Sequence, residues 1–332
     1  MTWSADRPFQ SLALAGGGFR GLFTARVLQV IEEHTKNPVG KYFDLACGTS
    51  IGGIVALAVA FEVPMAKVVK VFQEEGMNIF PPHEPPTSKF GKVVDLFRHR
   101  NKPRYSTEPL REAITKLIDK DATLGDALHA VAIPAVNVTQ GRPQVFKTRH
   151  KAEWNRDWRL KAVDVAIATA AAPTFFELAE VGGNLYADGG LFANAPDLVA
   201  IHEAEHFFRV PVEAQRLLSI GTTTKSYSVS FGAGRQFGVA DWMEDQRLFS
   251  VTISSQQQFV DQLVVHRMGE RYFRLDHEPS QEQARDLGLD IATDVAQQTL
   301  IALAIKGATD VLGTRLVPYL LHQPQLQLIR EG

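Results

Sequence analysis

Apolar and polar residues follow two different periods along this chain. Short apolar runs alternate with longer segments in which apolar residues recur at the spacing of one helical face. The first apolar run and the periodic segment after it predict a strand over 11–15 and a helix over 19–36. The next pair predicts a strand over 42–48 and a buried helix over 51–61. Because such alternation is typical of a mostly parallel sheet with helices on both faces, the pattern predicts an α/β fold.

The rest of the chain continues this pattern with one interruption. Further strands are expected over 130–139, 144–148, 185–189, 216–222 and 271–276, and a helix over 161–171. Residues 76–105 combine five prolines with a basic cluster, which predicts an irregular cap over one end of the sheet. Neither a repeat nor a linker divides the sequence. We therefore expect a single domain over 1–332, with a core at 9–221 and a helix-rich C-terminal part at about 241–332.

Composition excludes several classes of protein. The chain of 332 residues is 45% hydrophobic with a formal net charge of -2, which argues against disorder and against a nucleic-acid polymer as partner. One cysteine, Cys47, leaves no internal disulfide framework, and the N-terminal residues lack a secretory signal pattern, so a cytoplasmic protein is expected. The longest apolar stretches are shorter than the roughly 20 residues that span a membrane. Membrane contact is therefore expected to be peripheral.

The first strand-to-helix junction contains three consecutive glycines, in LALAGGGFRGL. Free N–H groups at Gly16, Gly17 and Gly18 would favour an anion, either a bound phosphate or a transient oxyanion. Gly16, Gly18 and Gly21 also fit the dinucleotide pattern G-x-G-x-x-G. That pattern needs an acidic residue at the end of the second strand, whereas Asp44 lies near the start of the predicted strand. A nucleotide cofactor in this loop remains the less favoured alternative.

The second strand ends in a motif that is typical of a nucleophilic serine. Gly48, Ser50 and Gly52 fit G-x-S-x-G, in which a tight strand-to-helix turn projects a serine hydroxyl above the sheet. The alternative is that Ser50 only caps the following helix. Placement between a predicted strand and a predicted helix favours the nucleophile.

A nucleophilic serine needs a base, and the sequence offers two kinds. The downstream histidines are His202, His206, His266, His277 and His322. Of these, His277 follows the strand predicted at 271–276 and is the one that suits a triad. His202 and His206 have the spacing of a metal pair, but HEAEH lacks the H-E-x-x-H pattern and a third ligand, so no metal site is predicted. The alternative base is Asp188 in YADGG, which would otherwise be a plain Asp-Gly turn.

Together, GGGFRG, GTSIG and DGG, in this order and with ATAAAPTFFEL before the last, resemble the patatin-like phospholipases, which are serine acyl hydrolases with a Ser-Asp dyad. The resemblance implies a three-layer patatin-like fold with a helical C-terminal portion. It also implies Ser50 as nucleophile and Asp188 as base, without a catalytic cofactor or metal. The implied oxyanion hole consists of Gly16, Gly17 and Gly18. The implied supporting residues are Arg20, Gly21, Gly48, Gly52, Gly189 and Gly190.

A finer resemblance connects the chain to compact bacterial patatin-like effectors of anti-phage signalling systems (CBASS). It rests on the opening FQSLALAGGGFRGLFTARVLQVIEE together with FDLACGTSIGGIVAL and LYADGGLFANAP. It implies a phospholipase that is activated by a cyclic di- or trinucleotide, forms a homo-oligomer, and degrades phospholipid at the inner face of the cell membrane. Alternatives are a constitutive housekeeping lipid acyl hydrolase, a nucleotide-binding sensing module without activity and, less favoured, an exported toxin.

The expected cap also carries a candidate membrane contact. Its apolar residues are Phe80, Phe90, Leu96 and Phe97, and its basic residues are Lys89, Lys92, Arg98, Arg100, Lys102 and Arg104. Such interleaving favours docking on anionic head groups, with apolar side chains in the interface. The alternative is a solvated insertion that packs on the core.

Overall fold

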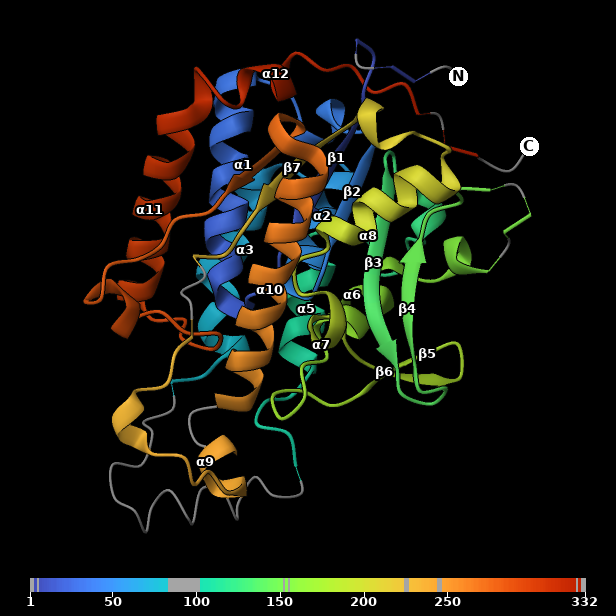
Figure 1. Ribbon diagram of the computed structural model, residues 1–332. Coiled ribbons are helices and arrows are strands. Elements are labelled where there is room, and N and C mark those ends of the chain that lie inside the picture. The colour runs from blue at the N-terminus through green and yellow to red at the C-terminus, as the bar shows by residue number, and fades with distance from the viewer. Residues whose placement is uncertain are drawn as a thin grey trace.

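The computed structural model describes residues 3–4, 6–82, 102–151, 153–154, 156–223, 227–243, 247–326 and 328–329. These residues form an eight-stranded sheet between two helical layers (Figure 1). The strands are β1 (Phe9–Leu14), β2 (Leu45–Gly48), β3 (Ala130–Asn137), β4 (Arg142–Lys147), β5 (Ala179–Val181), β6 (Asn184–Asp188), β7 (Gln215–Ile220) and β8 (Tyr272–Leu275). Their order across the sheet is β5-β6-β3-β2-β1-β7-β8, and β4 also pairs with β3.

The sheet is parallel at its centre and antiparallel at one edge. Strands β3, β2, β1, β7 and β8 run parallel, whereas β4, β5 and β6 pair in antiparallel fashion. Along β1, Leu12 and Leu14 pack into one helical layer, and Phe9 and Ala13 pack into the other. Because both faces are covered, this strand reads as a continuous apolar run. The predicted mostly parallel α/β sheet is confirmed.

The larger helical layer covers one face of the sheet. It consists of α1 (Gly21–Thr35), α2 (Ile51–Ala60), α3 (Met65–Ile79), α5 (Glu108–Thr115), α6 (Ala162–Ala170) and α11 (Asp294–Leu312). The opposite face is covered by α8 (Asp197–His202), which continues into a π-helical turn over Glu203–Phe207, and by α10 (Arg247–Met268). The short helices are α7 (Gly190–Ala193), α9 (Val239–Met243) and α12 (Val317–Leu320). Among the described residues, no helix has both the length and the apolarity to cross a bilayer.

Two expectations about local structure need correction. The strand predicted from 42 begins at Leu45, because Val39–Tyr42 forms a 3-10 turn that leads into it. The cap predicted over 76–105 begins later, since α3 continues to Ile79. Residues 83–101 lie outside the described part, and with them Phe90, Leu96, Phe97, Lys89, Lys92, Arg98 and Arg100. Phe80 packs against Tyr105 and Phe176, as the alternative of an insertion packed on the core expects.

A buried carboxylate joins the two ends of the chain. Asp44 is 2% exposed, and its Oδ2 accepts a hydrogen bond from the backbone N–H of Gln10 and lies 2.8 Å from His322 Nε2. Its Oδ1 accepts from the backbone N–H groups of Gln325 and Leu326 at 2.8 and 3.0 Å. All of these partners belong to the protein itself. Asp44 therefore has a structural role, and the ribose of a dinucleotide finds no acidic partner here.

We expect Asp44→Ala to lower the free energy of unfolding by about 3–5 kcal/mol, because three backbone donors and a buried imidazole lose a charged acceptor. Urea denaturation measures this. Asp310→Ala is the matched control, since Asp310 is an exposed partner of Lys306 on α11, and its loss should cost less than about 0.5 kcal/mol. Equal midpoints for the two variants would contradict the anchoring role.

Candidate active site

Ser50 lies in a strained turn between β2 and α2. Its backbone has φ 56° and ψ -128°, a conformation that non-glycine residues rarely adopt and that is the signature of a nucleophile elbow. The turn is possible because Gly48 and Gly52, two residues before and after Ser50, have no side chains. A Cβ at Gly52 would overlap the carbonyl oxygen of Leu14, and a Cβ at Gly48 would overlap that of Gly52. These contacts explain the glycine at both flanking positions.

Strand pairing brings Asp188 to the level of Ser50. Cys47 of β2 pairs with Ala132 of β3, and Asp188, the last residue of β6, pairs with Ala135 on the other side of β3. Ser50 follows Cys47 by three residues, as Ala135 follows Ala132. The two side chains meet there: Ser50 Oγ donates a hydrogen bond to Asp188 Oδ2 at 2.7 Å. Ser50 makes no side-chain bond to the helix that follows it, so the capping alternative lacks its defining contact.

The environment of Asp188 changes its basicity. The residue is 2% exposed, and its Oδ1 accepts a hydrogen bond from the Gly190 N–H at 2.6 Å. Burial raises the pKa of Asp188 to about 6, while the hydrogen bonds from Ser50 and Gly190 oppose that rise. A carboxylate with this pKa is ionised at neutral pH and is a stronger base than an exposed aspartate. The following Gly189 packs so closely on β3 that a Cβ would overlap the Pro134 carbonyl oxygen.

The glycine loop presents two free donors beside the serine. Among the described residues, the N–H groups of Gly17 and Gly18 have no acceptor, whereas the neighbouring Gly16 N–H donates to the Asn194 carbonyl at 2.9 Å. The Phe19 N–H likewise donates to the Leu289 carbonyl at 2.8 Å. The predicted set of three glycine donors is therefore reduced to Gly17 and Gly18, and Gly16 serves to hold the turn. Gly18 has φ +56°, and a Cβ there would overlap the Leu289 carbonyl oxygen.

Arg20 and Gly21 support this loop from behind. The Arg20 Nε donates to the Gly17 carbonyl at 3.4 Å, and burial lowers the pKa of Arg20 while the charge of Asp276 opposes that shift. A Cβ at Gly21 would overlap the side chain of Ile51, so α1 and α2 approach closely at this point. Arg20 thus contacts the glycine loop itself, whereas Gly21 lets α1 pack against the residue that follows Ser50.

The structure adds positioning residues that the motifs did not identify. Thr169 of α6 accepts a hydrogen bond from the Ser50 N–H at 2.9 Å and donates to the Pro134 carbonyl at 2.6 Å. Its own carbonyl accepts from the Gly189 N–H at 3.2 Å. Thr169 thus ties the serine turn to the aspartate turn. The available signal was a hydroxyl within the buried apolar helix AVDVAIATA.

Two further side chains fix the glycine loop from the opposite side. Asn194 Nδ2 donates to the Gly16 carbonyl at 3.3 Å, and Thr222 Oγ1 donates to the same oxygen at 3.1 Å. Asn194 follows α7 and Thr222 follows β7, so two segments far from the glycines in sequence meet at the loop. No pattern in the sequence links these positions to the glycines, because the contacts depend on strand order.

None of the candidate histidines contacts Ser50. His322 is bound to Asp44, and His202 and His206 stack on each other at the exposed surface with ring centroids 5.2 Å apart. His266 is exposed on α10, and His277 does not line the pocket that contains Ser50. No cluster of three or more metal-ligating side chains occurs in the described part of the chain. The geometry favours Asp188 over histidine as the base.

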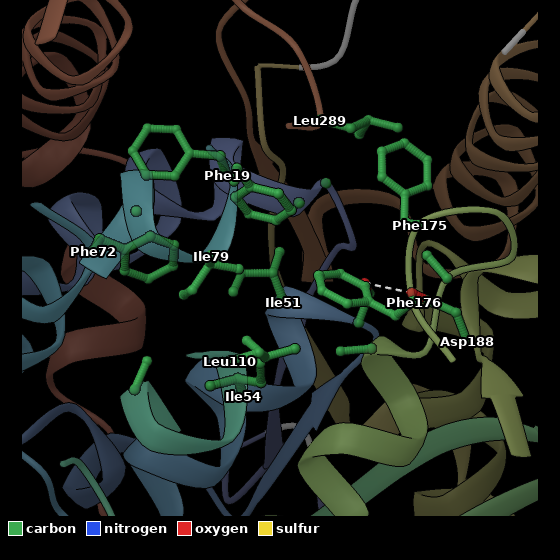
Figure 2. Close-up of a pocket in the computed structure, with 18 of the residues that line it drawn as sticks. Phe19, Ile51, Ile54, Phe72, Ile79, Leu110, Phe175, Phe176, Asp188 and Leu289 are labelled. Carbon is green, nitrogen blue, oxygen red and sulfur yellow. Dashed lines mark hydrogen bonds between the residues drawn. The ribbon is translucent and has the colours of Figure 1, made fainter. Parts of the chain in front are cut away.

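Ser50, Asp188 and the glycine loop open into an apolar pocket (Figure 2). Phe19, Ile51, Phe72, Ile79 and Leu110 line it from the larger helical layer, and Figure 2 shows Asp188 at its edge near Phe176. Other lining residues are Ile54, Val71, Phe80, Ala113, Ile114, Leu117, Phe175, Phe249, Ile253 and Leu289. An apolar cavity next to a serine with free N–H donors fits the ester of an aliphatic acid.

Comparison with known proteins identifies the family. Residues 12–201, more than half of the chain, match the family of the patatin-like phospholipases. The chain belongs to this family. The match includes Ser50 and Asp188, and it confirms the family and the fold that the three glycine motifs indicated.

Individual relatives extend the similarity to nearly the whole chain. This patatin-like chain is 37% identical over 327 residues to a cGAMP-activated phospholipase of Pseudomonas aeruginosa. The alignment covers 98% of this chain and 95% of the relative. It is 34% identical over 324 residues to a cGAMP-activated phospholipase of Vibrio cholerae, which covers 90% of each. The crystal structure of VipD from Legionella pneumophila aligns with 90% of this chain and 67% of its own at 13% identity, with a TM-score of 0.40.

The raised pKa of Asp188 predicts a pH-dependent activity. Because the base must be ionised, kcat/KM for a soluble ester should rise about tenfold per pH unit below about pH 6 and level off above it. A profile controlled by a group with an ordinary aspartate pKa near ~4 would contradict this.

Asp188→Asn tests the same group through stability. The pKa of Asp188 is about 4 in the unfolded chain and about 6 in the folded protein. Because the folded state holds the proton more tightly, the protein becomes less stable as the pH rises from about 4 through about 6. The amide has no such cost, so the variant should lose activity yet gain about 1–3 kcal/mol in the free energy of unfolding at neutral pH. A loss of stability together with activity would show that the carboxylate is needed structurally.

Thr169→Val removes the hydroxyl that holds the Ser50 turn while keeping the shape of the side chain. We expect kcat to fall by about 10–100-fold with little change in KM, because the nucleophile loses its alignment but the pocket is intact. Thr169→Ser keeps the hydroxyl and should retain most of the activity. A valine variant with normal kcat would contradict the positioning role.

Proposed function

We propose that this protein is a phospholipase that hydrolyses acyl esters of membrane phospholipids through Ser50 and Asp188. The observation that carries the proposal is the 2.7 Å hydrogen bond between Ser50 Oγ and Asp188 Oδ2 at the mouth of an apolar pocket. Membership of the patatin-like phospholipases supports the reaction class.

In the first half-reaction, Ser50 Oγ attacks the ester carbonyl carbon while Asp188 accepts the hydroxyl proton. The carbonyl oxygen becomes an oxyanion that accepts hydrogen bonds from the Gly17 and Gly18 N–H groups. One such donor in a dry site contributes about 2.7–4 kcal/mol to the stability of the transition state. When the tetrahedral intermediate collapses, the lysophospholipid leaves as an alcohol that takes its proton from Asp188.

In the second half-reaction, Asp188 removes a proton from water, which attacks the acyl-Ser50 ester. The same N–H groups stabilise the second oxyanion, and its collapse releases the fatty acid and returns the proton to Ser50 Oγ. One carboxylate thus acts in both halves as base and then as acid. No metal or cofactor enters the scheme.

We further propose that a cyclic nucleotide activates the enzyme. Relatives that are 34–37% identical over 90–98% of this chain bear the name cGAMP-activated phospholipase. Such regulation suits a lipase that would damage its own host membrane, and it fits the proposed action at the inner face of the cell membrane as a homo-oligomer in anti-phage defence. A constitutive lipid acyl hydrolase is the second candidate. The Ser50–Asp188 hydrogen bond, together with Gly17 and Gly18 N–H groups that have no acceptor among the described residues, argues against a silent sensing module.

The test is the release of fatty acid from phosphatidylethanolamine and phosphatidylglycerol vesicles, with and without cGAMP and a panel of other cyclic di- and trinucleotides. Activity should require one nucleotide and should fall by at least about a thousandfold in Ser50→Ala. Equal activity in all samples would remove the regulation and leave the lipase. Absence of activity together with absence of Ser50 labelling by a fluorophosphonate probe would contradict the enzyme.

A further inference from the structure

An exposed apolar segment lies beside the active-site half of α10. We call residues 227–243, which include α9, the apolar arm. Phe231 is 100% exposed and Val239 is 82% exposed, and Val229 and Trp242 are exposed by 42% and 36%. Leu248, at the start of α10, is 52% exposed. Single exposed apolar residues are common on soluble proteins, but several large ones in one short segment indicate a binding surface.

The apolar arm is held in place by polar contacts at its base. The Tyr227 N–H donates to Ser254 Oγ at 3.0 Å, and Arg247 donates to the Tyr227 hydroxyl and to the Asp241 carbonyl at 3.2 and 2.8 Å. The Arg247 guanidinium also lies over the Phe237 ring, 5.0 Å from its centroid. The chain therefore fixes the base of the arm to α10 while Phe231 and Val239 stay in solvent.

The same end of α10 forms part of the acyl pocket. Phe249 and Ile253, in the first turns of the helix, line the pocket with Ser50. Gln256 Nε2 donates to the Leu191 carbonyl of α7, which follows Asp188 directly. Figure 1 shows α9 at the lower end of the molecule, beyond the N-terminal end of α10 and toward the end at which β3 points. The arm is thus continuous with the wall of the catalytic pocket.

We propose that the apolar arm inserts into the phospholipid bilayer and brings the acyl pocket to the membrane surface. This inference rests on the proposed phospholipase function, which makes a lipid surface the substrate. Aromatic and aliphatic side chains that are costly to expose to water gain by entering the acyl region, and tryptophan suits the interface. A bilayer can bury all of these side chains at once without a matching shape, whereas a protein partner needs a complementary surface.

The charge of the arm sets the character of the binding. Arg235 and Asp241 are its two charged residues, and their charges cancel. Insertion by the arm is therefore driven by apolar burial, with little dependence on salt or on anionic lipid. This differs from the contact expected of the basic residues between 89 and 104, which would weaken with salt.

The test compares Phe231→Ser/Val239→Ser with the parent protein in two assays, with cGAMP present. In the first, cosedimentation with vesicles is measured in a Ser50→Ala background, so that the lipid stays intact. The double variant should bind vesicles at least about tenfold more weakly, since burial of one such side chain raises the affinity by about tenfold. The loss should be equal on phosphatidylcholine and phosphatidylglycerol vesicles and at about 0.1 and about 0.5 M salt.

In the second assay, the double variant with Ser50 intact should hydrolyse a monomeric short-chain ester at the parent rate but vesicle phospholipid at least about tenfold more slowly. Leu321→Ser is the matched control. Leu321 is 77% exposed and follows α12, which lies at the upper end of the molecule in Figure 1, so its loss should change neither assay.

Each outcome has a separate meaning. Unchanged vesicle binding by the double variant would overturn the proposal. Loss of a dimer in sedimentation equilibrium with vesicle binding unchanged would overturn it in favour of a second copy as the occupant. A parent protein that hydrolyses neither substrate contradicts the proposed function, whereas the binding assay, which needs no turnover, still decides the role of the arm.

Discussion

The hydrogen bond between Ser50 and Asp188 is the interaction on which the rest of the site depends, and it joins residues that are 138 positions apart. It forms because β2 and β6 both pair with β3, on opposite sides of it. The register of each pairing brings Ser50, which follows β2, and Asp188, which ends β6, to the same level along β3. The sheet is mixed at this point. β6 runs antiparallel to β3 and ends opposite Ala135, with its aspartate beside the serine hydroxyl.

Catalytic geometry of this kind opposes local stability. Ser50 has a backbone conformation that costs free energy, and Asp188 is ionised in a place where burial favours its neutral form. The surrounding protein offsets these costs with contacts that have no role in the chemistry itself. Thr169 binds the turns of both residues, and the Gly16 carbonyl accepts from Asn194 and Thr222. Four glycines of the three motifs also allow a close approach of another backbone segment, which a Cβ would block: Gly18, Gly48, Gly52 and Gly189.

The C-terminal third is part of this site, although the family match ends at residue 201. Leu289 accepts the hydrogen bond from Phe19 that holds the glycine loop, and the adjacent Asp290 binds Arg104 and Tyr105 at 3.1 and 2.8 Å. Residues 102–105 end the cap expected from sequence, so one short C-terminal segment connects that cap to the oxyanion donors. The N-terminal turns of α10 complete the pocket.

Sequence alone indicated the proposed chemistry of this protein, because the proposed nucleophile, base and oxyanion donors each carry a local signature. Gly-x-Ser-x-Gly, Asp-Gly-Gly and the glycine run identify turns whose shape depends on a few neighbouring residues, and alternating strand and helix patterns place those turns at strand ends. Tertiary structure decided which of these residues lie together and what contacts them. It left the Gly17 and Gly18 N–H groups free while the Gly16 N–H is bound, and it brought Asp188 rather than a histidine to Ser50. It also brought Thr169, Asn194, Thr222 and Leu289 to the site. It also fixed the base of the exposed apolar arm to α10, whose first turns line the pocket. These choices depend on strand order and register, which long-range packing sets and which leave no periodic or local mark on the chain.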